Sequence, residues 1–213
     1  MLNKINSDFQ NSNSPAKVAV VGAGDYGIGL ILQLEKIKNL ETSIIVDKKI
    51  KKAKNALEKA KVPEKHIKEI DSIQEIKKGL KQDKKLICSD INLIPKSPVD
   101  VVVDCTGNVN SGAILAYKSI LEKKHVVEVN VEMDVLIGPL LNNLAKKLGV
   151  IYTAADGDQP SLIASMVSWA RSIGLEIVAA GKGTKLYSEE KIKEKLSKDD
   201  VSFSTVAYLD GTK

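Results

Sequence analysis

Short apolar runs alternate along the chain with stretches in which apolar residues recur every three or four positions. The runs are rich in valine and isoleucine, which is typical of parallel strands buried on both faces, and they occupy residues 17–22, 42–47, 99–103 and 125–129. The periodic stretches predict helices, at residues 25–40, 51–61 and 111–122. Strands that alternate with helices predict an α/β fold, in which a doubly wound, mostly parallel sheet is covered by helices.

The remaining elements follow weaker patterns. Isoleucines at every third position over residues 64–79 predict one or two short helices at the sheet edge, and residues 86–88 predict a short strand. Further strands are expected at 150–155 and 175–180. Proline is favoured at the first position of a helix, so we expect helices to begin at Pro139 and at Pro160.

A glycine pattern follows the first strand. Gly22, Gly24 and Gly27 form a G-x-G-x-x-G sequence, with Asp25 and Tyr26 between the last two glycines. In a strand–turn–helix unit, the first glycine permits a sharp turn, the second lets the backbone approach a diphosphate, and the third lets helix and strand pack closely. The pattern, together with its strand and helix, predicts a Rossmann-type site for NAD or NADP. A tightly packed turn without a ligand is the alternative.

Other strand ends are expected to complete this site. Asp47 ends the second strand, 20 residues after Gly27, where a carboxylate commonly binds the ribose. Ligands of doubly wound sheets bind beyond the carboxyl ends of the strands, so Thr106, Gly107 and Asn130 should face the same crevice. Asp47 favours NAD, whereas the lysines that follow it could neutralise the 2′-phosphate of NADP, and the sequence leaves both cofactors open.

The composition and charge of the chain indicate which kinds of binding partner to expect. The chain is 43% hydrophobic and 28% charged, as in ordinary globular proteins. The formal net charge is +5, yet residues 48–85 hold 14 lysines against 6 acids, spaced with apolar residues as on a solvated helix surface. We therefore expect no nucleic-acid partner. Residues 1–15 lack the apolar core of a signal peptide and no long apolar run follows, so we expect a cytoplasmic protein without membrane contact.

Polar clusters at later strand ends are candidates for chemistry. Asp156, Asp158 and Gln159 could bind the substrate, or cap the following helix. Lys182, between two glycines, could donate a proton or anchor an anion, or could lie in a solvated loop.

Three further pairs of residues bear on catalysis or metal binding. Asp210 and Lys213 place an acid and a base one helical turn apart, although a solvated terminal pair is the alternative. His66 and His125 have no neighbouring ligand pattern, so no metal is expected. Cys88 and Cys105 lack a C-x-x-C spacing and are expected to be buried thiols.

Several of these motifs carry a family resemblance. They are V-A-V-V-G-A-G-D-Y-G, V-D-V-V-V-D-C-T-G, H-V-V-E-V-N-V-E-M-D, G-V-I-Y-T-A-A-D-G-D-Q-P, V-A-A-G-K-G-T-K and L-D-G-T-K. In them the chain resembles the N-terminal half of the homoserine-dehydrogenase-like NAD(P)-dependent oxidoreductases. The branch concerned often carries a SAF domain and includes deoxyxylulose-phosphate-reductoisomerase-like proteins.

The resemblance implies catalytic roles. Lys182 or Lys213, with Asp210, would polarise a substrate carbonyl or deliver a proton during hydride transfer. One departure counts against homoserine as substrate, because Val131 and Glu132 follow Asn130 where homoserine dehydrogenases carry a lysine. Those enzymes also carry an acid and a lysine four residues apart, and Asp210 and Lys213 are similar but lie three residues apart. A small polar carbonyl or hydroxyl compound, such as a sugar phosphate, is the expected substrate, with homoserine as an alternative.

The resemblance also suggests a domain organisation. Residues 1–16 are expected to form a disordered lead-in, 17–155 a dinucleotide-binding domain, and 156–213 the incomplete start of a substrate and dimerisation region. We expect a homo-oligomer if this region is completed. The alternative from a different functional class is a regulatory nucleotide-binding module, or a fragment, without turnover.

Overall fold

The computed structural model of the protein describes residues 15–155 and 159–180. The chain divides into two compact units after residue 155, and each unit is described here by itself. The predicted domain boundaries remain a prediction, and residues 1–14, which include most of the expected lead-in, lie outside the described residues.

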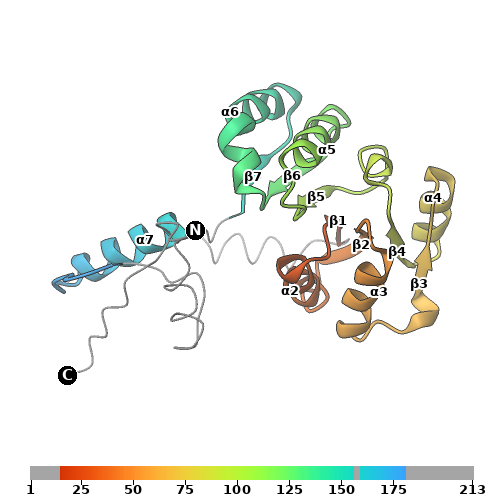
Figure 1. Ribbon diagram of the computed structural model, residues 1–213, viewed down its shortest axis with the longest axis horizontal. Helices are drawn as coiled ribbons and strands as arrows, with labels where there is room; N and C mark the ends of the chain where they lie inside the picture. The colour runs from red at the N-terminus through yellow and green to blue at the C-terminus, as the bar shows by residue number, and fades with distance from the viewer. Residues whose placement is uncertain (1–14, 156–158, 181–213) are drawn as a thin grey trace, which may run out of the picture. The chain divides into compact units, whose positions relative to one another are not determined.

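The first unit is organised around a sheet of seven strands in the order β3-β4-β2-β1-β5-β6-β7 (Figure 1). Every pair of neighbouring strands is parallel, which confirms the predicted doubly wound fold. The strands are β1 (Ala16–Val21), β2 (Leu40–Val46), β3 (Ile67–Glu69), β4 (Lys85–Cys88), β5 (Val101–Asp104), β6 (His125–Glu128) and β7 (Tyr152–Ala154).

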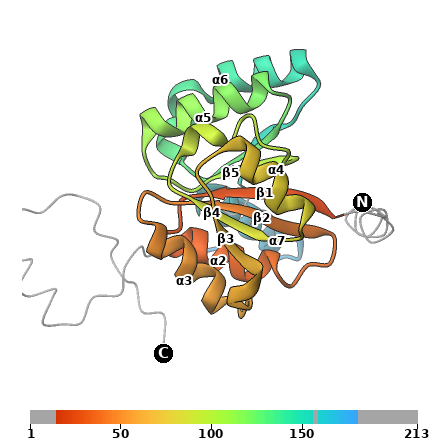
Figure 2. The same cartoon turned by 90° about the vertical axis from the view of Figure 1, so that its right-hand side faces the viewer.

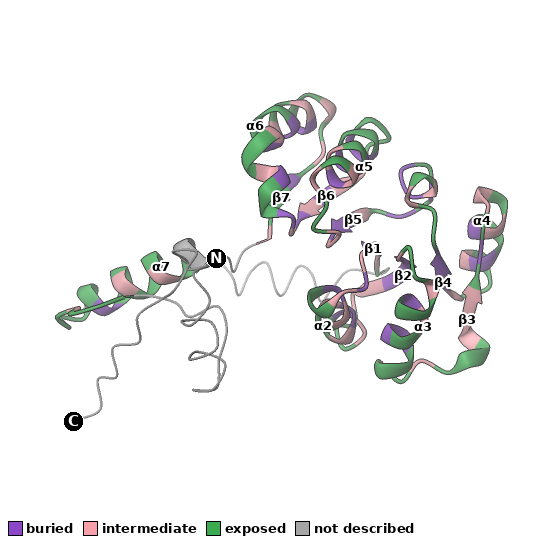
Figure 3. Cartoon of the chain, in the orientation of Figure 1, coloured by how far each residue is buried: buried purple, intermediate pink, exposed green. Residues whose placement is uncertain are grey.

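Helices cover both faces of this sheet, as Figure 2 shows. They are α2 (Asp25–Leu34), α3 (Ile50–Lys59), α4 (Ile73–Lys81), α5 (Val109–Leu121) and α6 (Val131–Leu148), with short 3₁₀ turns η1 (Glu64–His66) and η2 (Ile91–Leu93). Ile31 of α2 and Leu57 of α3 pack on one face, while Ile76 of α4 and Leu115 of α5 pack on the other. A third cluster joins α5 to α6 and contains Met133. Buried residues accordingly follow the strands and the inner sides of the helices (Figure 3).

The chain reverses its direction of winding at β1. On one side Val21 of β1 pairs with Val46 of β2, and on the other side it pairs with Asp104 of β5. The chain therefore builds the β2 half of the sheet first and then returns to the opposite side of β1. In open α/β sheets the crevice beyond such a switch point is where ligands bind.

Three elements differ from the sequence-based expectations. β3 lies where short helices were predicted over residues 64–79; three residues are too few to show strand alternation, and only α4 follows the helical spacing. Pro139 does not begin a helix but lies inside α6, which begins eight residues earlier because Asn130 caps it. No strand forms at residues 175–180, where Leu175 and Val178 are exposed.

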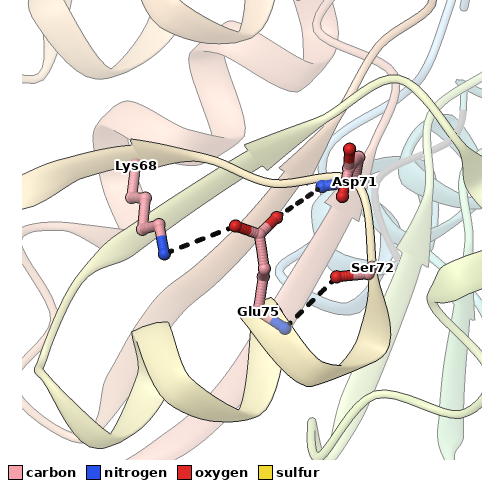
Figure 4. Close-up of polar contacts among 4 residues, drawn as sticks. All are labelled: Lys68, Asp71, Ser72 and Glu75. Atoms are coloured by element: carbon pink, nitrogen blue, oxygen red, sulfur yellow. Dashed lines mark hydrogen bonds and ion pairs between the residues drawn. The ribbon is translucent and has the colours of Figure 1, made fainter.

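The start of α4 is fixed by side chains, as Figure 4 shows. Ser72 Oγ accepts a hydrogen bond from the Glu75 amide at 3.4 Å, and Glu75 Oε2 accepts one from the Asp71 amide at 3.1 Å. Lys68 Nζ lies 3.7 Å from Glu75 Oε1. The Asp71 hydrogen bond, followed by the Lys68 charge, lowers the pKa of Glu75. Ser72 thus caps the helix at one of the amides that the helix itself leaves without a partner, while Glu75 holds the residue before the cap.

Replacing Ser72 with alanine should lower the free energy of unfolding by about 1 kcal/mol, because the Glu75 amide loses its acceptor. Urea denaturation followed by circular dichroism measures the difference. Ser72→Asp is the matched control, since aspartate also caps helices. Equal losses in both variants would contradict a capping role for the hydroxyl.

The second unit is described only by its helix α7 (Gln159–Ser172) and the residues after it. The helix includes Pro160 in its first turn, as the sequence predicted. Its less exposed side carries Ile163, Val167 and Ala170. In both described ranges, every helix falls short of the length or apolar content that a bilayer crossing requires.

Candidate functional site

The turn after β1 leaves no space for side chains at two of its glycines. Gly22 has φ of +103°, and a Cβ atom there would lie 2.5 Å from the carbonyl oxygen of Cys105. A Cβ atom on Gly27 would overlap the carbonyl oxygen of Gly22. Gly24 differs, because a Cβ atom there would have no neighbour within 4 Å. The first and third glycines are therefore required by packing, while the second leaves open space over the backbone.

This open space lies at the start of a helix. Gly24 is the N-cap of α2, and no side chain caps the helix. The first amides of an α-helix have no partner within it, and they carry the positive end of the helix dipole. Asp25 and Tyr26 occupy the first turn with exposed side chains. Such a helix start can bind a phosphate through backbone N–H groups.

Asp47 is tied to this turn. Its Oδ2 accepts a hydrogen bond from the Ala23 amide at 2.9 Å, and its Oδ1 accepts one from the Lys49 amide at 2.8 Å. One carboxylate therefore joins the glycine turn after β1 to the segment that leads from β2 into α3. The side chain remains on the wall of a cleft and can accept further hydrogen bonds there.

The cleft has a volume of about 290 Å³ and lies at the carboxyl ends of the strands. It brings together Gly22, Asp47 and Thr106, which sequence reasoning had placed in one crevice. The cleft is also lined by Lys48 and Lys49, the lysines that sequence reasoning offered as partners of a 2′-phosphate, and by four polar residues that it did not name, Lys52, Ser89, Asn108 and Ser111. Asn108 could have been found, because its Oδ1 caps α5 by accepting from the Ser111 amide at 2.9 Å, a spacing visible in the sequence.

Six expected cofactor residues are not among those that line this cleft: Gly24, Asp25, Tyr26 and Gly27 at the start of α2, and also Gly107 and Asn130. Gly107 forms part of the turn after β5 and has φ of +60°. Asn130 is buried, and its side chain is engaged within the protein: Oδ1 accepts from the Met133 amide at 3.4 Å, and Nδ2 donates to Asp104 Oδ2 at 3.4 Å. A direct cofactor contact by either residue stays a prediction.

Buried acids lie beneath the turns that follow β5 and β6. Asp104 and Glu128 end these strands, and both are almost fully buried. Burial, and next the Asp104 carboxylate, raise the pKa of Glu128 to about 9. Sequence reasoning missed Glu128, which stands as a single acid inside an apolar run. Burial likewise raises the pKa of both free thiols, Cys88 and Cys105, to about 12, so neither is a ready nucleophile.

The expected catalytic residues cannot be placed in the same way. Lys182, Asp210 and Lys213, together with Asp156 and Asp158, lie outside the described residues. Gln159 is the first residue of α7. Over residues 15–155 and 159–180, no group of three His, Cys, Asp or Glu side chains is arranged to hold a metal ion.

Comparisons with known proteins show what the chain is similar to. Residues 157–213 match the family model described as "Oxidoreductase DRL, catalytic domain". The comparison with curated proteins gives no match.

Solved structures share the fold. An oxidoreductase from Agrobacterium radiobacter, solved with NAD+, L-tartaric acid and magnesium, is 12% identical with a TM-score of 0.53 over 74% of this chain and 41% of its own. A homoserine dehydrogenase from Thiobacillus denitrificans is 17% identical with a TM-score of 0.51 over 66% of this chain and 29% of its own. The scyllo-inositol dehydrogenase from Lactobacillus casei, solved with NAD(H) and scyllo-inositol, is 10% identical with a TM-score of 0.50 over 74% and 42%.

The chain thus spans less than half the length of these structures, and at such identities they show the fold alone. The family match covers the sequence motifs A-G-K-G-T and L-D-G-T-K, and D-G-D-Q-P apart from its first residue, Asp156. The chain thus has a doubly wound fold over its first unit, and its residues 157–213 are similar to the catalytic domain of oxidoreductase DRL.

Proposed function

We propose that the protein is an NAD(P)-dependent oxidoreductase that acts on a small polar carbonyl or hydroxyl compound, such as a sugar phosphate. The observation that carries the proposal is the glycine turn at the switch point. The turn is open at Gly24 and begins a helix that has no side-chain cap, and its first glycine, Gly22, lines the cleft beside Asp47 and Thr106. The match of residues 157–213 to an oxidoreductase catalytic domain supports the same activity.

The residues present fit a dinucleotide. The amides at the start of α2 would bind the diphosphate, because they lack intrahelical partners, no side chain caps the helix, and the space at Gly24 is open. Asp47 would accept hydrogen bonds from ribose hydroxyls, and Thr106 would contact the cofactor from the β5 side. A bound nicotinamide would supply or accept the hydride. Gly107 and Asn130 are proposed to support this part of the site.

The substrate is proposed to bind at residues 156–159. Asp156, Asp158 and Gln159 would hold polar groups of the substrate, and Lys182, Asp210 and Lys213 would polarise its carbonyl oxygen and move the proton. The support for these roles is the family match over this segment, together with the motifs that the sequence shares with the reductoisomerase-like branch. A sugar phosphate suits lysine side chains, which bind phosphate as point charges.

The cofactor is proposed to be NAD or NADP, and the cleft carries arguments for each. Asp47 places a negative charge where the 2′-phosphate of NADP would lie, whereas Lys48, Lys49 and Lys52 line the same cleft with positive charge. Titration of the full chain with NADH and NADPH determines which charge prevails.

Replacing Gly24 with alanine tests dinucleotide binding at the turn. The new methyl group meets nothing within 4 Å, and the backbone φ of −77° suits alanine, so the fold should be unchanged. A diphosphate that approaches this backbone would meet the methyl group, and we expect the Kd for NADH or NADPH to rise about tenfold or more, equivalent to about 1.4 kcal/mol. Isothermal titration calorimetry measures the affinity.

Gly29→Ala is the matched control, because Gly29 lies on the same helix with open space around it. It should leave the affinity unchanged. If Gly24→Ala binds as tightly as the wild-type protein, the diphosphate does not lie on this turn. Turnover is tested separately by NADPH or NADH oxidation with aldose and ketose phosphates; binding without any hydride transfer would favour the regulatory module.

A further inference from the structure

Two buried carboxyl groups lie side by side where β5 and β6 end. Asp104 and Glu128 are opposite each other in the parallel register, and they are 0% and 1% exposed. Helix α5 closes the space above them, because a Cβ atom on Gly112 would overlap Asp104 Oδ2. Water is therefore excluded from at least one side of the pair.

Each carboxyl group holds the turn that follows its own strand. Asp104 Oδ1 accepts a hydrogen bond from the Thr106 amide at 2.8 Å, and Glu128 Oε1 accepts one from the Asn130 amide at 2.9 Å. The two turns are also joined to each other, since Asn130 Nδ2 donates to Asp104 Oδ2 at 3.4 Å. Thr106 and Asn130 are residues assigned above to the cofactor side of the sheet. The carboxyl pair thus forms a brace between two strand-end turns.

This brace is connected to the glycine turn. The Cys105 amide donates to the Val21 carbonyl at 2.7 Å, and the Cys105 carbonyl oxygen packs so closely on Gly22 that no side chain fits there. Movement of the turn after β5 would therefore displace the backbone around Gly22. A change in the position of the buried carboxyl pair would therefore reach the cleft through Cys105 and Gly22.

The surroundings of the pair favour a proton on Glu128. Glu128 Oε2 is buried and has no hydrogen-bond partner as a carboxylate. Burial first, then the Asp104 charge, and also a hydrogen bond with Asp104 favour the protonated acid, which raises the pKa of Glu128 to about 9. The other groups that act on it are acidic as well: Asp134 of α6, Cys105 after β5, and Tyr152 of β7, whose hydroxyl donates to Asp134 Oδ1 at 2.7 Å. Two charged carboxylates could not stay together here.

We propose that Glu128 and Asp104 are positioning residues that share one proton and thereby hold the turns at Thr106 and Asn130 in the arrangement that binds the dinucleotide. The inference rests on the proposed function for its ligand. Loss of the proton places two like charges in the buried site, the turns separate, and the cofactor affinity falls. The protein would bind its cofactor in the neutral range and release it at alkaline pH.

The test compares cofactor affinity across pH in the full chain. The Kd of the wild-type protein for NADH and NADPH is measured by calorimetry at pH 7.5 to 10. With a pKa of about 9, the affinity should fall about tenfold for each pH unit above it. In Glu128→Gln the new amide keeps a donor toward Asp104 and does not titrate. We therefore expect the Kd of this variant to change less than about twofold over the same pH range, apart from the change that deprotonation of surface lysines causes.

Glu122→Gln is the matched control, since Glu122 is exposed at the end of α5, and it should follow the wild-type curve. If Glu128→Gln loses affinity with the wild-type pH dependence, the positioning role is overturned. A second measurement needs no ligand: in carbon-13 spectra, the Glu128 carboxyl and the backbone carbons of Thr106 and Asn130 should shift with one common midpoint, and this coupling should vanish in Glu128→Gln. If the three signals have no common midpoint, the brace is overturned. If the wild-type protein binds neither nucleotide at pH 7.5, the proposed function is overturned, and the spectroscopic result alone decides whether the brace exists.

Discussion

Replacing Gly27 with alanine should lower the free energy of unfolding by about 3 kcal/mol. A Cβ atom at this position would overlap the carbonyl oxygen of Gly22, which is backbone and cannot rotate away as a side chain would. Helix α2 would have to move off the turn, and the buried contacts of Ile31 and Leu34 would loosen with it. Urea denaturation followed by circular dichroism measures the loss, and calorimetry should show weakened dinucleotide binding as well.

Gly29 provides a control within the same helix. Its added Cβ atom would meet nothing within 4 Å, so Gly29→Ala should raise the free energy of unfolding by about 0.5–1 kcal/mol through the better helix propensity of alanine. Opposite signs for the two variants would show that contact with the turn, and not helix propensity, decides the effect at Gly27. A stable Gly27→Ala protein would contradict the close packing of α2 on the turn.

Raising the pH should destabilise the wild-type protein relative to Glu128→Gln. The pKa of Glu128 is raised from 4.5 to about 9, so the folded state keeps a proton that the unfolded state has already lost between these values. The stabilisation is complete below pH 4.5 and is lost as the pH rises through about 9. The slope is about 1.4 kcal/mol per pH unit, which gives about 3 kcal/mol between pH 6 and pH 8.

The measurement is the free energy of unfolding from urea titrations at pH 6, 7 and 8 for both proteins. Exposed groups distant from Glu128 contribute alike in the two proteins, so their contributions cancel in the difference. A constant difference between pH 6 and pH 8 would show that Glu128 is ionised in the folded protein. This result would stand whether or not the protein binds a dinucleotide.

Local patterns in the sequence were sufficient to predict most of the sheet. The apolar runs that became β1, β2, β5 and β6 are bounded by residues that end strands, and the glycine at position 22 marks a turn with positive φ. Because parallel strands end on one edge, this also predicted that Gly22, Asp47 and Thr106 would meet at one cleft.

Features that depend on contacts distant in the sequence were missed. The Asp104–Glu128 pair arises from the register of β5 on β6, and nothing local to either acid indicates it. β3 was missed because pairing with β4, and not periodicity, makes three residues a strand. Pro139 predicted a helix start, yet the cap at Asn130 and the packing of Met133 and Leu141 hold α6 together across the proline. The strand expected at residues 175–180 has no partner strand in the described parts of the chain.

The position of β1 between β2 and β5 has a consequence for how the protein forms during synthesis. The nascent chain can pair β1 with β2 early, but Val18 to Val21 must wait for Val101 to Asp104 before the second side of the glycine turn exists. A half-made chain would thus contain the nucleotide motif without a pocket to hold the nucleotide. Ligand present in the cell would stabilise only chains that have completed the central pairing, and would leave folding intermediates exposed to chaperones and proteases.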